Sequence, residues 1–361
     1  MSSDIPHALR VAGGGLLAAG VLAAGAAAGA AIERAVMART SRPDTRTHDW
    51  ELEDFNAHVV ELEMDDGTRI HVEVDEPEDP AMAGVTVVFA HGYALNLDSW
   101  YFQRRELHGR ARLVSYDQRS HGASGRGEFD SHHVDQLGTD LGAVIDAIAP
   151  EGPLVLIGHS MGGMTIMALA EQRPELFAQR VYGVGLISTT AGGLRNAPLG
   201  LPPLVGRAVM RVAPAVSAAL ARQKDLVERG RQSSSDLALL LTRAYSFGSN
   251  ASDQAARFVA GMINATPIDV LAEFLPALQE HDKRAVLPVL QQAEVLVVVG
   301  DADRLTPMEH SLEIVRAIPG AEFVVIEHGG HMALIEFHEE VDRLIAGLLD
   351  RVRRNIADGA A

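Results

Sequence analysis

Residues 154–163 read LVLIGHSMGG, and this stretch decides how the rest of the chain is organised. Four apolar residues lead to Gly158, His159 and Ser160, and a helical pattern, MTIMALAEQ, follows the two glycines at the end of the stretch. The pattern predicts a buried strand, a sharp turn and a helix. Glycines two positions before and after Ser160 leave room for the strand and the helix to approach each other. We therefore expect Ser160 at the tip of a strained turn, in the position of a nucleophile.

The helix that begins directly after Ser160 supports the same interpretation. Its free N–H groups and the positive end of its dipole face the serine oxygen, where negative charge develops during acyl transfer. A G-x-S-x-G motif also arises by chance in a chain that holds many glycines and serines. The interpretation therefore depends on an acid and a base elsewhere in the sequence.

The composition is that of a globular protein. The 361 residues are 47% hydrophobic and can build one large domain or two modest ones. The net charge of −17 is spread along the chain, which argues against nucleic acid as a partner because phosphate binding needs a concentrated basic surface. The chain has no cysteine, so disulfides, thiolate metal sites and a cysteine nucleophile are excluded.

Residues 11–32 form an uncharged stretch that is rich in alanine and glycine. A membrane-spanning helix needs about 20 apolar residues, whereas the apolar core of a signal peptide has about 7 to 15. The length favours an anchor, so we expect membrane association through this segment and a protein anchored by one N-terminal helix. Two alternatives stay open: a signal peptide cleaved at a site such as residues 26–28, which gives a secreted protein, and a soluble helix.

From residue 57 onward the chain alternates between strand and helix patterns. Two period-2 runs joined at residues 65–67 predict an antiparallel hairpin. Short apolar runs predict buried strands at residues 85–90, 112–116, 154–157, 181–188, 294–300 and 322–326. Helical patterns lie at residues 137–149, after Ser160, near Met308 and after His331. The alternation predicts an α/β fold with a mainly parallel, doubly wound sheet, and it places the site beyond the carboxyl ends of the strands.

The alternation stops after Gly192 for about ninety residues. Amphipathic helix patterns there lie at residues 204–212, 236–244 and 253–263. We expect a helical cap that covers the strand ends and contacts the substrate. The predicted organisation is an anchor or signal segment at 1–37, a linker at 38–56, a first part of the core at 57–192, the cap at 193–292 and a second part of the core at 293–361.

Donors for an oxyanion hole follow the strand predicted at residues 85–90. This strand leads into His91, Gly92 and Tyr93, where a bend in the backbone is expected. We expect the backbone N–H of Tyr93 to lie beside the backbone N–H of Met161 and to bind an oxyanion with it. Without Ser160 at its sharp turn, the nucleophile elbow, the same residues would be interpreted as an ordinary loop.

The acid and the base are expected after the last two strands. Asp303 and His331 each stand just past a strand end, in the chain order serine, aspartate, histidine that is known from one class of triads. Asp117, Arg119 and His121 also follow a strand and carry reactive groups. For these three, hydrogen bonds that hold a turn are a simpler explanation than catalysis.

Three motifs together resemble those of one known family. These are GHSMGG at residues 158–163, DQRSHGAS earlier in the chain at 117–124 and GDADRLTP later at 300–307. They match the nucleophile elbow, the D-x-R-G-x-G-x-S turn and the G-x-x-D-x-x-x-P acid loop of the α/β-hydrolase fold family. The resemblance covers about residues 55–352 and is to the serine-esterase, monoacylglycerol-lipase-like and haloperoxidase-like branch. Ser120 stands where the turn usually has glycine, and the spacing of the acid loop selects Asp303 over Asp301.

This resemblance implies a serine hydrolase that cleaves carboxylic esters through an acyl-enzyme. It makes Ser160 the nucleophile, His331 the base, Asp303 the acid that orients the base, and Tyr93 and Met161 the backbone oxyanion donors. No metal or cofactor is needed for this chemistry. A serine nucleophile excludes epoxide hydrolases and dehalogenases, because these use an aspartate.

The expected substrate is a small, lipophilic ester with an apolar acyl group, because the predicted cap is rich in leucine, valine, methionine and phenylalanine. Two alternative functions stay open. The first is a cofactor-free perhydrolase of the haloperoxidase-like kind, which uses the same triad. The second is a catalytically inactive, membrane-tethered binding module.

Overall fold

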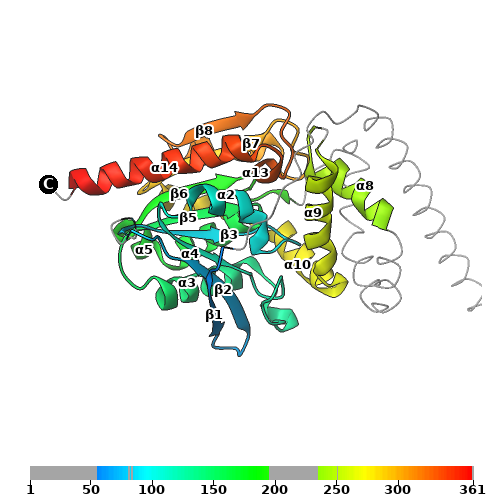
Figure 1. Ribbon diagram of the computed structural model, residues 1–361, viewed down its shortest axis with the longest axis horizontal. Helices are drawn as coiled ribbons and strands as arrows, with labels where there is room; N and C mark the ends of the chain where they lie inside the picture. Colours follow the sequence, from blue (N-terminus) through cyan, green and yellow to red (C-terminus); the bar gives the residue numbers. More distant parts are fainter. Residues whose placement is uncertain (1–54, 80–81, 83, 195–234, 250, 360–361) are drawn as a thin grey trace, which may run out of the picture. The chain divides into compact units, whose positions relative to one another are not determined.

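A computed structural model describes residues 55–79, 82, 84–194, 235–249 and 251–359 (Figure 1). The predicted anchor or signal segment, nearly all of the predicted linker and the helix predicted at residues 204–212 lie outside the described residues. The prediction of a membrane anchor therefore stays a prediction.

Eight strands form one sheet within the described residues. Their bounds are β1 His58–Glu63, β2 Arg69–Asp75, β3 Thr86–Ala90, β4 Arg112–Tyr116, β5 Leu154–His159, β6 Val181–Ile187, β7 Glu294–Gly300 and β8 Glu322–Ile326. The strand order is β1-β2-β4-β3-β5-β6-β7-β8. β1 and β2 form the predicted antiparallel hairpin, β2 pairs antiparallel with β4, and all other pairs are parallel. The predicted α/β fold with a mainly parallel sheet is confirmed.

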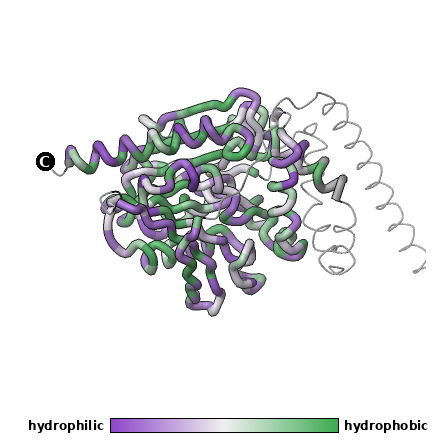
Figure 2. Tube along the Cα trace, in the orientation of Figure 1, coloured by the Kyte–Doolittle hydropathy of each residue, from purple (hydrophilic) through white to green (hydrophobic). Residues whose placement is uncertain are grey.

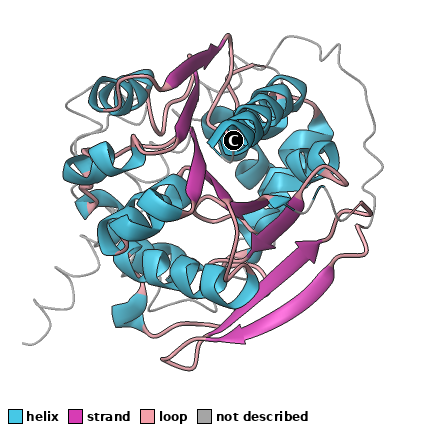
Figure 3. Cartoon of the chain, turned by 90° about the vertical axis from the view of Figure 1, so that its left-hand side faces the viewer, coloured by secondary structure: helices cyan, strands magenta, loops and turns pink. Residues whose placement is uncertain are grey.

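Helices cover both faces of this sheet (Figure 3). One face carries α2 (Tyr101–Leu107), α13 (Ala333–Glu336) and α14 (His338–Gly359). The other face carries α3 (Val134–Ile148), α4 (Met161–Gln172), α5 (Pro174–Gln179), α11 (Leu287–Leu290) and α12 (Met308–Ala317). Short 3₁₀ turns lie at η2 (Leu97–Trp100), η3 (Phe129–Ser131) and η5 (Arg284–Val286).

β3 and β5 are buried along their whole length and are mostly apolar, because both faces of the sheet are covered. In β3, Val87 and Phe89 point into the core under α14, whereas Val88 and Ala90 point into the core over α4. Figure 2 shows hydrophobic segments in the middle of the described chain, where Figure 1 draws the strands. The buried strands end at the edge where the candidate residues lie.

Three further helices belong to the insertion after β6: α8 (Ser235–Ser246), α9 (Asp253–Ala265) and α10 (Ile268–Glu280). The first two match the predicted helices, and α10 was not among those predicted. Val270, Phe274 and Leu278 of α10 pack against Met161 and Met164 at the start of α4. Since α4 begins at the carboxyl end of β5, α10 lies at the edge of the sheet that carries the site (Figure 1).

Among the described residues, no single helix is both long enough and apolar enough to cross a membrane. The pair α9 and α10 passes that test only when the two helices are taken together, and they are bent by 92° relative to each other.

Candidate active site

Ser160 lies on a sharp turn between β5 and α4, as the sequence predicts. Its backbone φ and ψ angles are 52° and −116°, a conformation that residues other than glycine rarely adopt. The turn is crowded, because a Cβ added at Gly162 would lie 2.0 Å from the carbonyl oxygen of Ala90. The Ser160 N–H donates to the carbonyl of Ile187 at 3.0 Å, and the hydroxyl of Thr189 donates to the carbonyl of Ser160 at 2.6 Å. The strained turn is thus fixed from β6 and the residues that follow it.

The structure brings Ser160, His331 and Asp303 together at the carboxyl ends of β5, β7 and β8. The Oγ of Ser160 lies 3.0 Å from Nε2 of His331. Nδ1 of the same ring lies 2.9 Å from Oδ2 of Asp303. A neutral imidazole that donates from Nδ1 to the carboxylate keeps a lone pair on Nε2, and this lone pair can accept the serine proton.

The loop that carries Asp303 holds its carboxylate in place with hydrogen bonds. Oδ1 accepts from the N–H groups of Leu305 and Thr306, each at 2.9 Å, and Oδ2 accepts from the Thr306 hydroxyl at 2.8 Å. Burial by itself raises the pKa of the Asp303 carboxyl, but the nearby charge of His331 and these hydrogen bonds outweigh it, so that the pKa is lowered. Asp301 is exposed, whereas Asp303 is buried, so the geometry places Asp303 at the histidine.

Thr306 was not singled out from the sequence. Its position three residues after Asp303 could have indicated this role, because a short hydroxyl side chain there can bond back to a carboxylate in a turn.

The backbone of Tyr93 lies in a turn that follows β3. The N–H of Leu95 donates to the carbonyl of Gly92 at 3.2 Å and closes this turn around Tyr93 and Ala94. Within the described residues, the Tyr93 N–H donates to no backbone carbonyl. The N–H of Met161 is at the first position of α4, where a helix supplies no acceptor. Both N–H groups are therefore available to a ligand.

His91 holds the start of this turn. Its Nδ1 donates to the carbonyl of Gly92 at 2.8 Å, and its Nε2 accepts from the N–H of Gln118 at 2.9 Å. The side chain of Gln118 donates to the His91 carbonyl at 2.6 Å and accepts from the Thr165 hydroxyl at 2.7 Å. Gln118, which the sequence analysis did not single out, thus connects the turn before the elbow to the helix after it.

His159 holds the backbone of His331 in place. Its Nε2 donates to the backbone carbonyl of His331 at 3.0 Å, and its ring is fully buried. The approach to the turn after β3 is close, because a Cβ at Gly92 would lie 2.7 Å from Nδ1 of His159. His159 is an elbow residue, as the sequence predicts, and it also fixes the backbone of His331.

The loop of His331 has a second support in Glu336 of α13. The Glu336 carboxylate accepts from the N–H of Gly330 at 2.8 Å. It also accepts from the N–H groups of Gly248 and Ser249 at 3.1 and 2.7 Å. Glu336 therefore ties the residue before the histidine to the segment that follows α8.

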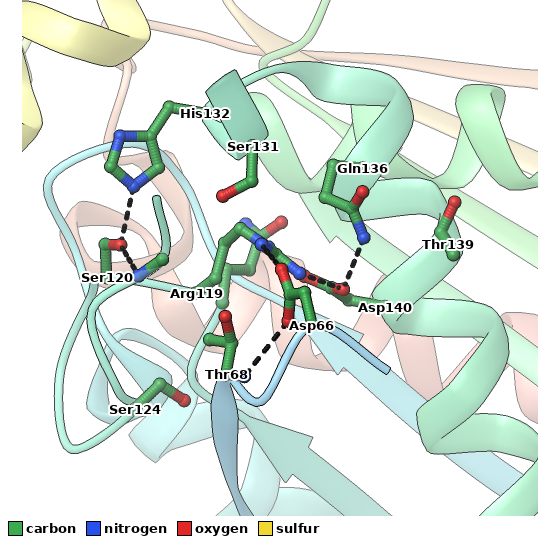
Figure 4. A network of polar contacts seen from close by, with 12 residues as sticks. Asp66, Thr68, Arg119, Ser120, Ser124, Ser131, His132, Gln136, Thr139 and Asp140 are labelled. Atoms are coloured by element: carbon green, nitrogen blue, oxygen red, sulfur yellow. Dashed lines mark hydrogen bonds and ion pairs between the residues drawn. The ribbon is translucent and has the colours of Figure 1, made fainter. Parts of the chain in front are cut away.

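The residues after β4 form a polar network (Figure 4). Arg119 is fully buried and pairs with Asp140 of α3 through two hydrogen bonds of 2.6 and 2.7 Å, and with Asp66 of the hairpin turn at 2.7 Å. The carboxylate of Asp117 accepts from the N–H groups of Leu97 and Ala123 at 2.8 and 2.7 Å. These contacts hold a turn, as predicted for Asp117 and Arg119, and they leave neither group free for catalysis.

Ser120 replaces the glycine that is usual in this turn, and its φ of 66° lies in the region that favours glycine. Its Oγ lies 2.7 Å from Nε2 of His132 and accepts from the N–H of Gly127 at 2.9 Å (Figure 4). Nδ1 of His132 lies 2.7 Å from Oε2 of Glu273 in α10. The distances resemble those of a triad, but Ser120 is buried and already accepts a hydrogen bond. The network instead connects the turn to α10.

The chain belongs to the alpha/beta hydrolase fold family, whose model matches residues 85–337. The AB hydrolase superfamily protein YisY of Bacillus subtilis is 26% identical over 266 residues, which cover 73% of this chain and 91% of that protein. The pimeloyl-[acyl-carrier protein] methyl ester esterase of Nitrosomonas europaea is 28% identical over 266 residues, which cover 71% of this chain and 92% of the esterase. A non-heme chloroperoxidase of Streptomyces lividans is 37% identical over 100 residues, which cover 27% of this chain and 34% of that protein. The protein is therefore an enzyme of the hydrolase class.

A solved structure with the same fold is that of a thermophilic esterase from Thermogutta terrifontis. It superposes with a TM-score of 0.62 at 23% sequence identity and covers 82% of this chain and 99% of its own.

Buried histidines around the site predict that the protein loses stability in mild acid. Burial lowers the pKa of His91 to about 3, of His121 to about 4 and of His159 to about 3, from 6.5. Because the folded-state pKa is lower, their contribution is complete above pH 6.5 and is lost as the pH falls toward 4. Below about pH 6, these three protons on the unfolded chain reduce the free energy of unfolding by about 4 kcal/mol per pH unit. Asp117 opposes this loss, because burial raises its pKa to about 6.

Urea unfolding at pH 7, 6 and 5 measures this effect, and the midpoint should fall at each step. The variant His159→Asn removes one of the three groups, so its stability should depend on pH with a slope that is smaller by about one proton. A midpoint that stays constant from pH 7 to pH 5 would contradict the prediction.

Proposed function

We propose that the protein is a serine hydrolase that cleaves carboxylic esters of apolar acyl groups through an acyl-enzyme. The observation that carries the proposal is the continuous chain of contacts from Ser160 to His331 at 3.0 Å and from His331 to Asp303 at 2.9 Å. It lies at the carboxyl edge of a parallel sheet, where this fold binds ligands. The esterase among the relatives supports the same class of reaction.

The proposed mechanism has two steps. Nε2 of His331 takes the proton of Ser160 while Oγ attacks the ester carbonyl, and the charge that develops on the carbonyl oxygen is bound by the N–H groups of Tyr93 and Met161. The imidazolium, held by Asp303, then protonates the leaving alcohol. Water activated by His331 attacks the acyl-enzyme, and the acid leaves.

An apolar cluster at the start of the helix that follows the nucleophile supports the preference for apolar acyl groups. Met161 follows the nucleophile directly, and Met164 lies one turn later in α4. Both are buried against Val270 and Phe274 of α10. Aliphatic acyl chains gain free energy by contact with such side chains, whereas charged acyl groups would lose their hydration without a partner.

We expect the specificity constant for p-nitrophenyl esters to rise from acetate to a chain of intermediate length and then to fall toward palmitate. Each methylene that is buried adds up to about 0.8 kcal/mol, or about a factor of four, until the binding space is filled. The measurement is a series of initial rates corrected with the Ser160→Ala variant, which removes hydrolysis by other protein groups.

The similarity to a non-heme chloroperoxidase and to a bifunctional esterase/perhydrolase makes a perhydrolase the alternative to test in parallel. Negligible ester hydrolysis beside rapid peracid formation from a carboxylic acid and hydrogen peroxide would replace the esterase by a perhydrolase. No rate in either assay would support a specialised substrate or the binding module.

A further inference from the structure

Tyr93 contacts both the proposed oxyanion hole, through its backbone, and α10, through its side chain. Its backbone N–H is the proposed donor to the oxyanion, and its phenol O–H donates to the carbonyl of Leu271 in α10 at 2.5 Å. Its ring packs on the apolar cluster that α10 forms with the start of α4. The side chain and the backbone of Tyr93 therefore contact different parts of the site.

The turn that carries Tyr93 needs support from outside. Ala94, the residue that follows, has a φ of 62°, which is unfavourable for a residue with a Cβ. The start of the turn is held by His91 and Gln118, and its end is held where the N–H of Leu97 donates to Asp117. Between these two anchors, the bond from the phenol fixes Tyr93 itself.

The acceptor on α10 is held firmly in place. Glu273, two residues after Leu271, pairs with Arg126 at 2.5 Å and lies 2.7 Å from His132. The ring of Phe274 packs against that of His132, with 4.6 Å between the ring centroids. Ion pairing and ring packing thus fix this part of α10 on the turn that follows β4.

We propose that the phenol of Tyr93 is a positioning group, which uses the Leu271 carbonyl to hold the Tyr93 N–H in the oxyanion hole. α10 then sets the geometry in which the transition state is stabilised, although it supplies no reacting group. The inference rests on the proposed function, because it requires an oxyanion. Burial raises the pKa of the Tyr93 phenol, so the group stays protonated and remains a donor over the pH range of ordinary assays.

The test is the variant Tyr93→Phe, which keeps the ring and the backbone N–H and removes only the hydroxyl. We expect kcat for p-nitrophenyl butyrate to fall about 10- to 100-fold, because a donor displaced by a fraction of an ångström stabilises the oxyanion less, while KM changes less than about threefold. Inhibition by an aliphatic trifluoromethyl ketone, which forms an oxyanion on the serine, should weaken by the same factor as kcat/KM. Replacement of Tyr93 by p-aminophenylalanine, which restores an N–H donor at the same position, should recover most of the loss.

The matched control is Tyr116→Phe. Tyr116 is also a buried tyrosine, and its hydroxyl makes no hydrogen bond to the described residues. This variant should keep the kcat of the wild type, and thermal unfolding should show that both variants are folded.

An unchanged kcat in Tyr93→Phe would overturn the inference, and so would a fall in kcat without a matching loss of trifluoromethyl ketone binding. Neither result would affect the proposed function as long as Ser160→Ala is inactive. Full activity in Ser160→Ala would instead reject the proposed function, and the inference with it.

Discussion

Replacement of Ser160 by alanine is expected to abolish ester hydrolysis without changing the stability of the fold. The Ser160 hydroxyl bonds to His331 and makes no cap for α4, so the change removes the proposed nucleophile and little else. Alanine and serine both carry a Cβ and are equally strained at a φ of 52°, so the strain in the turn is unchanged. Removal of a triad nucleophile typically lowers kcat by about a millionfold, which here means a fall to the background rate.

The measurement combines the rate with labelling by a fluorophosphonate probe. Wild-type protein should gain the mass of one phosphonyl group on the peptide that contains Ser160, and the variant should gain none. His331→Ala should be nearly as inactive, and the double variant should lose nothing further, because the members of a triad act as a unit. Hydrolysis near the wild-type rate in Ser160→Ala, with an unchanged unfolding curve, would remove Ser160 from the mechanism.

The second large effect is expected for Asp303→Asn, which should lower kcat by about 10⁴-fold. The carboxylate holds the histidine in the tautomer that has its proton on Nδ1. An asparagine can turn its amide N–H toward Nδ1 and stabilise the opposite tautomer, in which Nε2 carries a proton and cannot accept one from Ser160. The pKa of Asp303 is lowered, so the native carboxylate is charged throughout the range in which the assay is run.

Asp301→Asn is the matched control, because it makes the same change two residues away on an exposed side chain. We expect its kcat to stay within about twofold of the wild type. If the two variants changed places, with Asp301→Asn inactive and Asp303→Asn active, Asp301 would be the acid and the interpretation of the acid loop would be wrong.

The three residues of the proposed triad could be picked out from the sequence because each has a local signature. The elbow needs small residues where strand and helix approach, and Gly162, with no room for a Cβ, meets that need. Asp303 follows the buried strand β7, His331 follows the half-buried strand β8, and parallel strands bring their carboxyl ends to one edge. The alternation of strands and helices then implies the sheet on which the three residues meet.

Residues that hold the site in place through distant contacts, such as Gln118 and Ser120, have no such local signature. Gln118 resembles any polar residue of a loop until its amide is seen between His91 and Thr165. Ser120 was noticed as a departure from a motif, but its partner His132 lies 12 residues away in another turn. A single sequence contains no sign of such pairs, because they depend on how turns pack after the elements have formed.

The sequence by itself determined the strand–turn–helix at Ser160, the order of the sheet-forming segments and the chemistry of the proposed triad, because steric demands and hydrophobic periodicity act over a few neighbouring residues. Only the tertiary structure decided that α10 lies against the proposed oxyanion hole. Pro276 stands inside α10, and a proline in a helix interior speaks against a helix when the sequence is considered alone. The bond from Tyr93 to Leu271 joins residues 178 positions apart, and its geometry exists only once α10 has packed on Met161 and Met164.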